Sequence, residues 1–577
     1  MDSFNRWMVF LNDILWHNYV LYAILATGIL FTVWSRFGQA IALTHGWRVI
    51  RGQYDDPADP GAINHFQALS AALSATVGLG NIGGVALAIA LGGPGAVFWM
   101  WVVGFVGMAL KMTEVILAML YRNTDDPDNP HGGTMWVAKK AFERMNPRFA
   151  WLGSLVGGIF CVTLLVSTIT GGNMFQAWNV GEITESYFGI PSVFTGIVMA
   201  ILVALVIIGG IKRIGNVAGH LVPVMMALYI LGGLYVLAVN VEHLPSMFVL
   251  IFQGAFSETG ASGAFIGGTA GYAFLFGMKR ALFSNEAGQG SSPIAHSAAK
   301  TDEPVREGVV AGLEPFIDTL IVCTFTALVI LATGVWNRGP DTVYAAPPAV
   351  IEMSPGVWTI EAGPAPALSE GQWLDGEPVY TILSAHPNRN TGNDRHRLNG
   401  VVRLVNGQPI IEWEAFESEV EPALADPGIY DNVVGATLTA KAFDSAAPGL
   451  GKWLVTLTVW LFAISTMISW SYYGEQGMVY LAGQRSVLPY KIVSCALIIV
   501  ATMGLLNTDV ELDNLTGVGT GVMLFANIPI MLLLGGQAMR AYHNYVERLQ
   551  AGKMGPDHPK PSIDDVVSGR NLKLPKD

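Results

Sequence analysis

Long apolar runs separated by short polar segments make up most of the chain. Eleven of these runs reach about 18 residues, the length at which an α-helix crosses the hydrocarbon core of a bilayer. They lie at residues 14–35, 66–90, 95–120, 151–179, 192–211, 217–239, 263–299, 307–335, 453–481, 488–506 and 514–538. The pattern predicts an all-α polytopic membrane protein with eleven transmembrane helices.

The composition agrees with a membrane protein and excludes several other classes. Hydrophobic residues make up 52% of the 577 residues and charged residues 13%, about half the charged share that coats a soluble protein. Three cysteines without a CxxC pair exclude a disulfide scaffold and a cysteine-based zinc site. The net charge of −12 argues against nucleic acid as a partner, and the apolar runs call for membrane lipid instead.

The basic residues predict how the chain is oriented, because cytoplasmic loops are enriched in Lys and Arg. Loops on one side of an eleven-span chain, with the C-terminal tail, hold 23 of the 32 Lys and Arg. The short loops on the other side, near 90–94, 180–191, 240–262 and 507–513, hold none. We therefore expect a multi-pass protein of the cell membrane with its N-terminus outside and its C-terminus, residues 541–577, in the cytoplasm.

Residues 336–451 depart from the membrane pattern and form an expected outer-loop insert. The segment is rich in proline and acidic residues, and apolar and polar residues alternate on both sides of Asn406-Gly407. Such a pattern predicts a β-hairpin, so the insert is expected to be partly β. It is either a small outer subdomain or an element that docks an unknown partner or takes part in gating. The stretch Gly435–Phe443 is expected to form a short helix over the outer vestibule.

Two of the predicted spans are broken by glycine and polar residues. The first break runs from Ser74 to Gly84 and the second from Phe283 to Pro293. Unwound backbone survives in a membrane only where it lines a cavity or meets a ligand. Freed carbonyls can coordinate Na⁺, and the N-terminus of a half-helix attracts a carboxylate, so a small zwitterion with Na⁺ suits both breaks.

The positions of the breaks predict an internal repeat. If the first helix with its inner loop, residues 1–60, is an addition, the breaks fall in the first and sixth of ten core helices. The halves are then residues 61–240 and residues 260–335 with 452–540, and they run with opposite topology. Glycines that only permit close helix packing are the alternative explanation. The match of Gly78, Gly80 and Gly83 to a dinucleotide fingerprint is discounted, because no βαβ unit surrounds it.

Three motifs resemble the alanine or glycine:cation symporter family. They are the run from His65 through Trp101, with Gly78-Leu79-Gly80-Asn81-Ile82-Gly83-Gly84, then Gly172–Ala177, and Lys279–Gly288. The resemblance covers roughly residues 14–335 and 433–540. It implies a LeuT-type fold of inverted five-helix repeats plus one N-terminal helix. It also implies sodium-coupled uptake of alanine or glycine, with no cofactor and Na⁺ as the co-transported ion.

The resemblance also implies the binding residues. For sodium these are Ser74, Val77, Phe462, Ser465 and Thr466. For the substrate they are Thr76, Gly78, Leu79, Gly80, Asn81, Gln176, Phe283, Ser284, Asn285 and Trp470. Each polar assignment competes with hydrogen bonding between helices. Glu286 and Asp318 are membrane-embedded acids that either act in transport or pair with Lys279 or Arg280.

Other functions compete with sodium symport as explanations of this sequence. A proton-coupled amino-acid transporter of the same fold is the nearest alternative, with Glu286 or Asp318 carrying the proton. A channel would need a continuous polar pore. An enzyme is not expected, because no HExxH or GxSxG motif occurs and His296, four residues after Ser292, has no acid at a spacing suited to orient it. The choice among alanine, glycine and serine, and between enantiomers, stays open.

Overall fold

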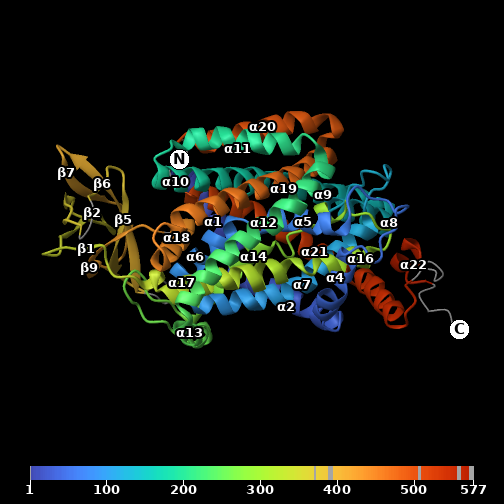
Figure 1. Ribbon diagram of the computed structural model, residues 1–577, viewed down its shortest axis with the longest axis horizontal. Helices are drawn as coiled ribbons and strands as arrows, with labels where there is room; N and C mark the ends of the chain where they lie inside the picture. The colour runs from blue at the N-terminus through green and yellow to red at the C-terminus, as the bar shows by residue number, and fades with distance from the viewer. Residues whose placement is uncertain are drawn as a thin grey trace.

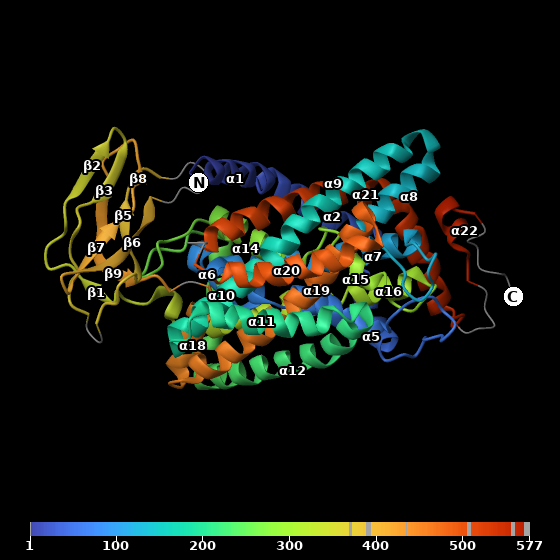
Figure 2. The same ribbon diagram turned by 90° about the horizontal axis from the view of Figure 1, so that it is seen from above.

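A bundle of helices runs along the long axis of the molecule (Figures 1 and 2). The computed structural model describes residues 2–368, 372–387, 394–433, 435–504, 509–554 and 560–570. The long apolar helices of the bundle are α2 Asn18–Trp34, α7 Gly95–Tyr121, α9 Ala150–Ile169, α10 Phe175–Phe188, α11 Ser192–Ile207, α12 Gly210–Val239, α17 Thr324–Thr333, α19 Thr456–Ala482, α20 Val487–Ala501 and α21 Asp509–Gln550.

Shorter helices complete or flank these spans. The halves of the broken spans are α5 His65–Thr76, α6 Val85–Gly92, α14 Ala270–Asn285 and α15 Pro293–His296, and α16 Pro304–Ala311 leads into α17. The flanking helices are α1 Asp2–Leu15, α3 Gln39–Ile41, α4 Trp47–Ile50, α8 Thr134–Met145, α13 Leu244–Phe256, α18 Gly435–Ala446 and α22 Ile563–Ser568. π-Helical turns connect several of them, among them η2 Gly80–Gly84, η4 Thr170–Met174, η6 Phe316–Cys323 and η8 Gly451–Val455.

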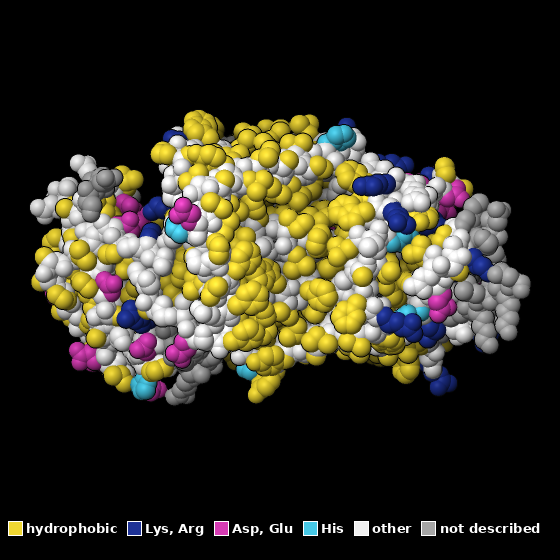
Figure 3. All heavy atoms as spheres, turned by 60° about the horizontal axis from the view of Figure 1, so that its bottom comes forward, with side chains coloured by type: hydrophobic (Ala, Val, Ile, Leu, Met, Phe, Trp, Pro, Cys, Tyr) yellow, Lys and Arg dark blue, Asp and Glu magenta, His cyan; other side chains and the backbone are white. Residues whose placement is uncertain are grey.

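Length and apolar composition identify the helices that cross the membrane. Within the described part of the chain eight helices pass this test, and a ninth does so if the pair His65–Thr76 and Gly80–Gly92, bent by 53°, counts as one span. Hydrophobic side chains cover the middle of the molecule, and Lys and Arg gather toward the end near the C-terminus (Figure 3). The protein is therefore helical and spans the membrane several times.

Some predicted boundaries differ from the structure. The expected first helix begins only at Asn18, as α2, and a separate helix, α1, precedes it. The expected loop 240–262 contains α13, and both this helix and α11, in the predicted span 192–211, are apolar but shorter than 18 residues. The span predicted from residue 263 begins at Ala270, because left-handed turns at Gly263 and Gly267 precede it. Lys279 and Arg280 lie inside α14 rather than in a loop, which leaves 21 of the 32 basic residues on the predicted inner side.

The segment between α17 and α18 contains two antiparallel sheets. One has the strand order β1-β9-β5-β6-β7-β4 and the other β2-β3-β8. Strands β6 and β7 pair across a tight turn in which Asn406 and Gly407 both have positive φ, as a two-residue hairpin turn requires. The strands are β1 Thr342–Val343, β2 Val350–Ser354, β3 Val357–Ile360, β4 Gly363–Pro364, β5 Pro378–Ser384, β6 Arg395–Val405, β7 Gln408–Trp413, β8 Phe416–Glu417 and β9 Ala423–Asp431.

The sheets lie at the end of the bundle opposite the C-terminus (Figures 1 and 2) and have a core of their own. Val379, Val402 and Ile411 are fully buried within it. The sheets also touch the bundle, since Tyr380 Oη donates to the carbonyl oxygen of Ala264 at 3.1 Å. After β9 the chain enters α18, and Thr439 Oγ1 of that helix donates to the carbonyl oxygen of Ile82 in the first break at 3.1 Å.

Deleting residues 345–428 and joining the ends with a short flexible linker should leave transport within about threefold of the full chain, since loop changes cost little free energy. The ends to be joined are Tyr344 and Ile429, and Ile429 is the partner of Thr342 across β1 and β9, so the two ends already lie close together. Uptake into proteoliposomes, normalised to correctly inserted protein, measures the effect. Loss of uptake in monodisperse deleted protein would show that the sheets belong to the transport cycle.

Candidate functional site

The first break lies where α5 ends and the chain turns into η2. Val77 leaves helical geometry with ψ of 88°, and the helix resumes at Gly80. The backbone amide of Gly78 donates to Asn81 Oδ1 at 2.8 Å, which fixes the turn. A Cβ on Gly78 would lie 2.5 Å from Thr466 Oγ1, so only glycine lets the hydroxyl of α19 approach this closely.

The second break lies between α14 and α15. Glu286 ends α14 in the left-handed region, with φ of 55°, and Gly288 and Gly290 also have positive φ. A left-handed non-glycine residue costs of order 1–3 kcal/mol and is typical of functional sites. Glu286 is buried and accepts a hydrogen bond from Ser291 Oγ at 2.5 Å. Its backbone therefore holds the carboxylate in a position that an ordinary helix would not provide.

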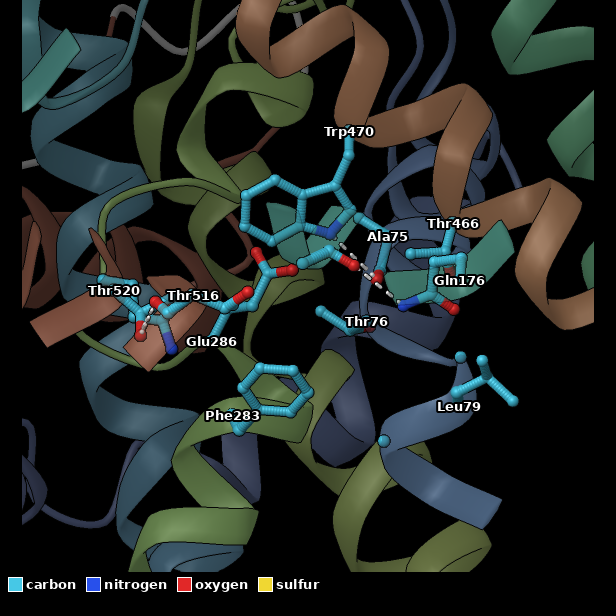
Figure 4. A pocket seen from close by; sticks show the side chains of 14 residues that line it. Ala75, Thr76, Leu79, Gln176, Phe283, Glu286, Thr466, Trp470, Thr516 and Thr520 are labelled. Atoms are coloured by element: carbon cyan, nitrogen blue, oxygen red, sulfur yellow. Dashed lines mark hydrogen bonds between the residues drawn. The ribbon is translucent and has the colours of Figure 1, made fainter. Parts of the chain in front are cut away.

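A small cavity lies between the two breaks, with about 380 Å³ of atom-free space. That figure counts space that is open to solvent, and the centre of a water-sized sphere has only about 30 Å³ to move in, so the cavity as it stands is narrow and suits only a small ligand. Seven predicted substrate residues line it: Thr76, Gly78, Leu79, Gly80, Gln176, Phe283 and Trp470. The other lining residues are Ala75, Gly171, Glu286, Gln289, Thr466, Thr516 and Thr520. Figure 4 shows Glu286 and Gln176 entering it from different elements.

Several acceptor atoms around the cavity have no partner among the described residues. They are Gln176 Oε1, Gln289 Oε1 and Thr466 Oγ1, and all three side chains are buried. A buried polar atom without a partner costs about 1–3 kcal/mol. Together with the carboxylate of Glu286, they form an acceptor-rich wall. A ligand that carries an ammonium group, or a bound cation, would satisfy these atoms.

Aromatic side chains close the cavity on two sides. Trp470 Nε1 donates to the carbonyl oxygen of Ala75 at 3.3 Å, which holds the indole against the first break (Figure 4). Phe283 meets Phe175 edge to face, with ring centroids 6.4 Å apart. Phe283 also lines a second cavity with Arg280, whose guanidinium lies 5.9 Å from the Phe283 ring centroid. The Phe283 ring therefore separates the cavity between the two breaks from this second cavity.

The other three predicted substrate residues lie outside the cavity lining. Asn81 Nδ2 donates to Asp318 Oδ1 at 2.5 Å, and Ser284 Oγ donates to Asp318 Oδ2 at 2.9 Å. Asn285 Nδ2 donates to Thr319 Oγ1 at 3.1 Å. These side chains leave the backbone on the far side of each break, toward η6. Asp318 thus accepts hydrogen bonds from Asn81 and Ser284, and Asn285 is connected to it through Thr319.

The cluster around Asp318 is rich in oxygen and fully buried. Thr319 Oγ1 donates to Asp318 Oδ2 at 2.7 Å, so three side-chain donors converge on one carboxylate. Cys323 Sγ lies 3.3 Å from Asn81 Nδ2 at the edge of the cluster. Carboxylate and hydroxyl oxygens are ligands that a hard cation prefers, whereas Asn81 turns its amide nitrogen toward the cluster and its oxygen toward the Gly78 amide. Thr319 is the neighbour of Asp318 in the chain, but Ser284 lies 34 residues away and Asn81 237 residues away, so the sequence alone does not bring them together.

The predicted sodium residues lie together where α5 crosses α19. Ser74 Oγ donates to the carbonyl oxygen of Ser465 at 2.6 Å, and Ser465 Oγ lies 3.4 Å from the carbonyl oxygen of Ser74. Ser465 Oγ also bonds back to the Phe462 carbonyl at 2.9 Å, the competing contact expected of a serine in a helix. Thr466 lies beside Gly78, and Val77 ends α5 at the same crossing.

A family model and an individual relative, compared with this chain separately, agree with each other. The family model described as "Sodium:alanine symporter family" matches residues 1–358 and 423–559. The chain is 35% identical over 525 residues to a protein of Methanococcus maripaludis named "Sodium/alanine symporter AgcS", with 91% of this chain and 93% of that one covered.

The chain is also similar to a bacterial protein and, more distantly, to a solved structure. A Bacillus subtilis protein named "Putative sodium/proton-dependent alanine carrier protein YrbD" is 31% identical over 544 residues, covering 94% of this chain and 92% of that one. Among solved structures, "Crystal structure of MhsT in complex with L-phenylalanine" is similar with a TM-score of 0.45 and 13% identity. It covers 88% of this chain and 95% of that one.

Proposed function

Because the chain belongs to the sodium:alanine symporter family, we propose that it carries a small neutral amino acid, alanine or glycine, into the cell together with Na⁺. The observation that carries this proposal is the small cavity between two broken helices, with unpartnered acceptors on its wall. A zwitterion needs donors for its carboxylate and acceptors for its ammonium group, and both lie within one cavity.

The carboxylate of the substrate faces the start of the half-helix Gly80–Gly92 in this proposal. Backbone amides at a helix N-terminus are free to donate, and the helix dipole favours negative charge there. Leu79 and Gly80 line the cavity at this point. The ammonium group faces Gln176 Oε1 and the carboxylate of Glu286 on the opposite side. Phe283 and Trp470 limit the side chain to a small one.

Sodium binds at two oxygen-rich places in this proposal. The first is the crossing of α5 and α19, with oxygen atoms of Ser74, Val77, Phe462, Ser465 and Thr466, the last a buried hydroxyl without a partner. The second is the cluster in which Asp318 meets the hydroxyls of Ser284 and Thr319, with Asn81 tying it to the first break. Each place joins a break to a neighbouring continuous helix, so an ion there stabilises the unwound backbone that also binds the substrate.

The proposed topology has eleven spans, with one N-terminal helix followed by two inverted five-helix repeats of the LeuT type. It is supported by the two breaks, which fall in the first span of each half. Hydrophobic side chains cover the middle of the molecule and basic residues gather at the C-terminal end, which supports a cytoplasmic C-terminus (Figure 3). Residues 61–240 form one half, residues 260–335 and 452–540 the other. Residues 336–451 are then the outer insert.

Uptake of labelled alanine and glycine into proteoliposomes tests the proposal. With a Na⁺ gradient at equal pH on both sides, we expect accumulation above equilibrium. Replacing Na⁺ by choline should abolish accumulation. Equal accumulation in both salts would contradict sodium coupling, and a dependence on a pH gradient alone would favour the proton-coupled alternative.

Replacing Phe283 with Ala should shift selectivity toward larger side chains. Each methylene newly accommodated gains about 0.8 kcal/mol, whereas the methyl group of alanine loses contacts across the space left behind. We expect weaker alanine binding and relatively better valine and leucine binding, with sodium dependence retained. Competition against labelled alanine measures the order. The same selectivity order in the variant and the parent protein would place Phe283 outside the substrate pocket.

A further inference from the structure

Six buried ionisable side chains form a continuous row within the helix bundle, here called the His–Glu row. Each is 2% exposed or less. The row lies where α5, α7, α15 and α16 meet, in the half of the bundle nearer the C-terminus (Figures 1 and 2). Its members are His65, Glu307, His296, Glu314, Lys111 and Glu114.

Contacts link the row from one member to the next. Glu307 lies between two imidazoles: one oxygen contacts His65 Nδ1, and the other is 2.5 Å from His296 Nδ1. The second nitrogen of His296, Nε2, is 2.5 Å from Glu314 Oε1. Glu314 Oε2 is in turn 3.3 Å from Lys111 Nζ. The sequence suggested no acid for His296, but the helix break before α16 brings two glutamates to it.

One end of the row reaches the second break, beside the cavity. Glu286 lines the cavity at the start of this break. Further along, the amide of Gly290 donates to Glu114 Oε2 at 3.2 Å, and Ser292 Oγ donates to Glu314 Oε1 at 2.8 Å. The unwound segment therefore has the cavity on one side and the acids of the row on the other.

The other end of the row reaches solvent. His65 Nε2 is 3.8 Å from Asp55 Oδ1, and the Asp55 side chain is 42% exposed. Asp55 lies in a loop on the predicted cytoplasmic side. His65 Nε2 has no hydrogen-bond partner among the described residues, and the 3.8 Å between it and the exposed carboxylate is a gap that one water molecule would bridge.

Other charges also face the row. Arg122 acts on Glu307 electrostatically while its guanidinium donates to the backbone oxygens of Ser297 and Ala299. The phenol of Tyr473, on α19, faces the acids near the break. The row itself contains three basic side chains, two histidines and one lysine, and three glutamates.

Both ring nitrogens of His296 meet carboxylates of different residues, so a proton can enter the ring at one nitrogen and leave it from the other. Histidine is the side chain whose charge changes most readily near neutral pH. Ionisable residues inside a membrane are rare, costly and typical of ion pathways and proton relays.

We propose that the His–Glu row transfers a proton between the substrate region and the cytoplasmic face, so that a proton moves with the amino acid and Na⁺. The inference rests on the proposed function. A proton passing from Glu314 to His296 Nε2 is matched by release of the Nδ1 proton to Glu307. The imidazole gains and loses one proton, and a half-turn of the ring restores it. From Glu307 the proton passes to His65 Nδ1, and His65 releases its Nε2 proton through a bridging water to Asp55.

The test uses the full chain in proteoliposomes that contain the pH-sensitive dye pyranine. An inward Na⁺ gradient is imposed, the membrane potential is clamped with K⁺ and valinomycin, and alanine uptake is measured in parallel. We expect alanine to acidify the lumen. His296→Gln and Glu307→Gln should each lower the protons moved per alanine at least about tenfold, while Na⁺-dependent alanine binding stays within about threefold, since neither residue touches the cavity.

A matched control is His45→Gln. His45 is also buried, but it has a single partner, Tyr545 Oη at 2.7 Å, and lies outside the row. This variant should move as many protons per alanine as the parent protein. Alanine uptake without acidification in the parent protein would overturn the inference and leave the proposed function intact. An unchanged proton ratio in a folded His296→Gln or Glu307→Gln variant would overturn it as well. Absence of any uptake would instead contradict the proposed function.

Discussion

Replacing Asp318 with Asn should raise the Na⁺ concentration for half-maximal alanine uptake by about 10- to 100-fold. Interactions with a charged group contribute about 1.5–3 kcal/mol, and each 1.4 kcal/mol is a factor of ten. The substitution removes the charge and leaves one acceptor oxygen where Asn81, Ser284 and Thr319 now donate to two. Uptake at a series of Na⁺ concentrations measures the effect.

Cys323→Ala is the matched control for this prediction. Its sulfur touches the same cluster, 3.3 Å from Asn81 Nδ2 and 3.5 Å from Ser284 Oγ, but a thiol is a poor ligand for a hard cation. The control should leave Na⁺ activation within about threefold of the parent protein. If Asp318→Asn is folded and activates at the same Na⁺ concentration, the cluster is a structural hydrogen-bond network and not an ion site.

Replacing Thr466 with Ala should raise the half-saturating Na⁺ concentration by about tenfold and leave the order of substrates unchanged. The hydroxyl is buried without a partner, and glycine at position 78 allows it to reach the first break. Losing one ligand oxygen costs about 1.5 kcal/mol, close to a factor of ten. Sodium titration of uptake, followed by competition among unlabelled amino acids, separates the two effects.

Thr458→Ala provides the comparison on the same helix. The hydroxyl of Thr458 is satisfied by the carbonyl oxygen of Leu454 at 2.9 Å, so no ion is expected there. Na⁺ activation should therefore be unchanged in that variant. Equal Na⁺ activation in Thr466→Ala and Thr458→Ala would remove Thr466 from the sodium site.

The two breaks could be predicted from the sequence because their signal is local. Glycine and polar residues inside an apolar run identify unwound backbone wherever they occur, and both predicted segments contain the end of a helix. Gly78, Leu79, Gly80 and Phe283 line the cavity because they belong to these segments.

The residues that the breaks meet could not be predicted in the same way. Asp318 lies 237 residues from Asn81 along the chain, and only the packing of η6 beside η2 brings them together. Thr516 and Thr520 reach the cavity from α21, where nothing in the apolar pattern separates them from lipid-facing threonines. Side-chain direction within a helix decides whether a polar residue meets the cavity or a neighbouring helix.

The apolar pattern also misplaces some helix boundaries, because it does not show where a cap or a turn interrupts a helix. A single apolar run covered Trp16 and His17, but the imidazole of His17 accepts the amide of Tyr19 and starts a new helix there. The apolar pattern includes the loop before α14 in the predicted span, because its residues are small and apolar. Turn geometry at Gly263 and Gly267 decides its path.

In the proposed mechanism the amino acid and Na⁺ bind together between the two broken helices. Binding of labelled alanine to the purified full chain can be measured at a series of Na⁺ concentrations, with choline keeping the ionic strength constant. We expect no measurable alanine binding without Na⁺ and an affinity that rises with Na⁺ concentration. Alanine binding of equal affinity in Na⁺ and in choline would contradict it.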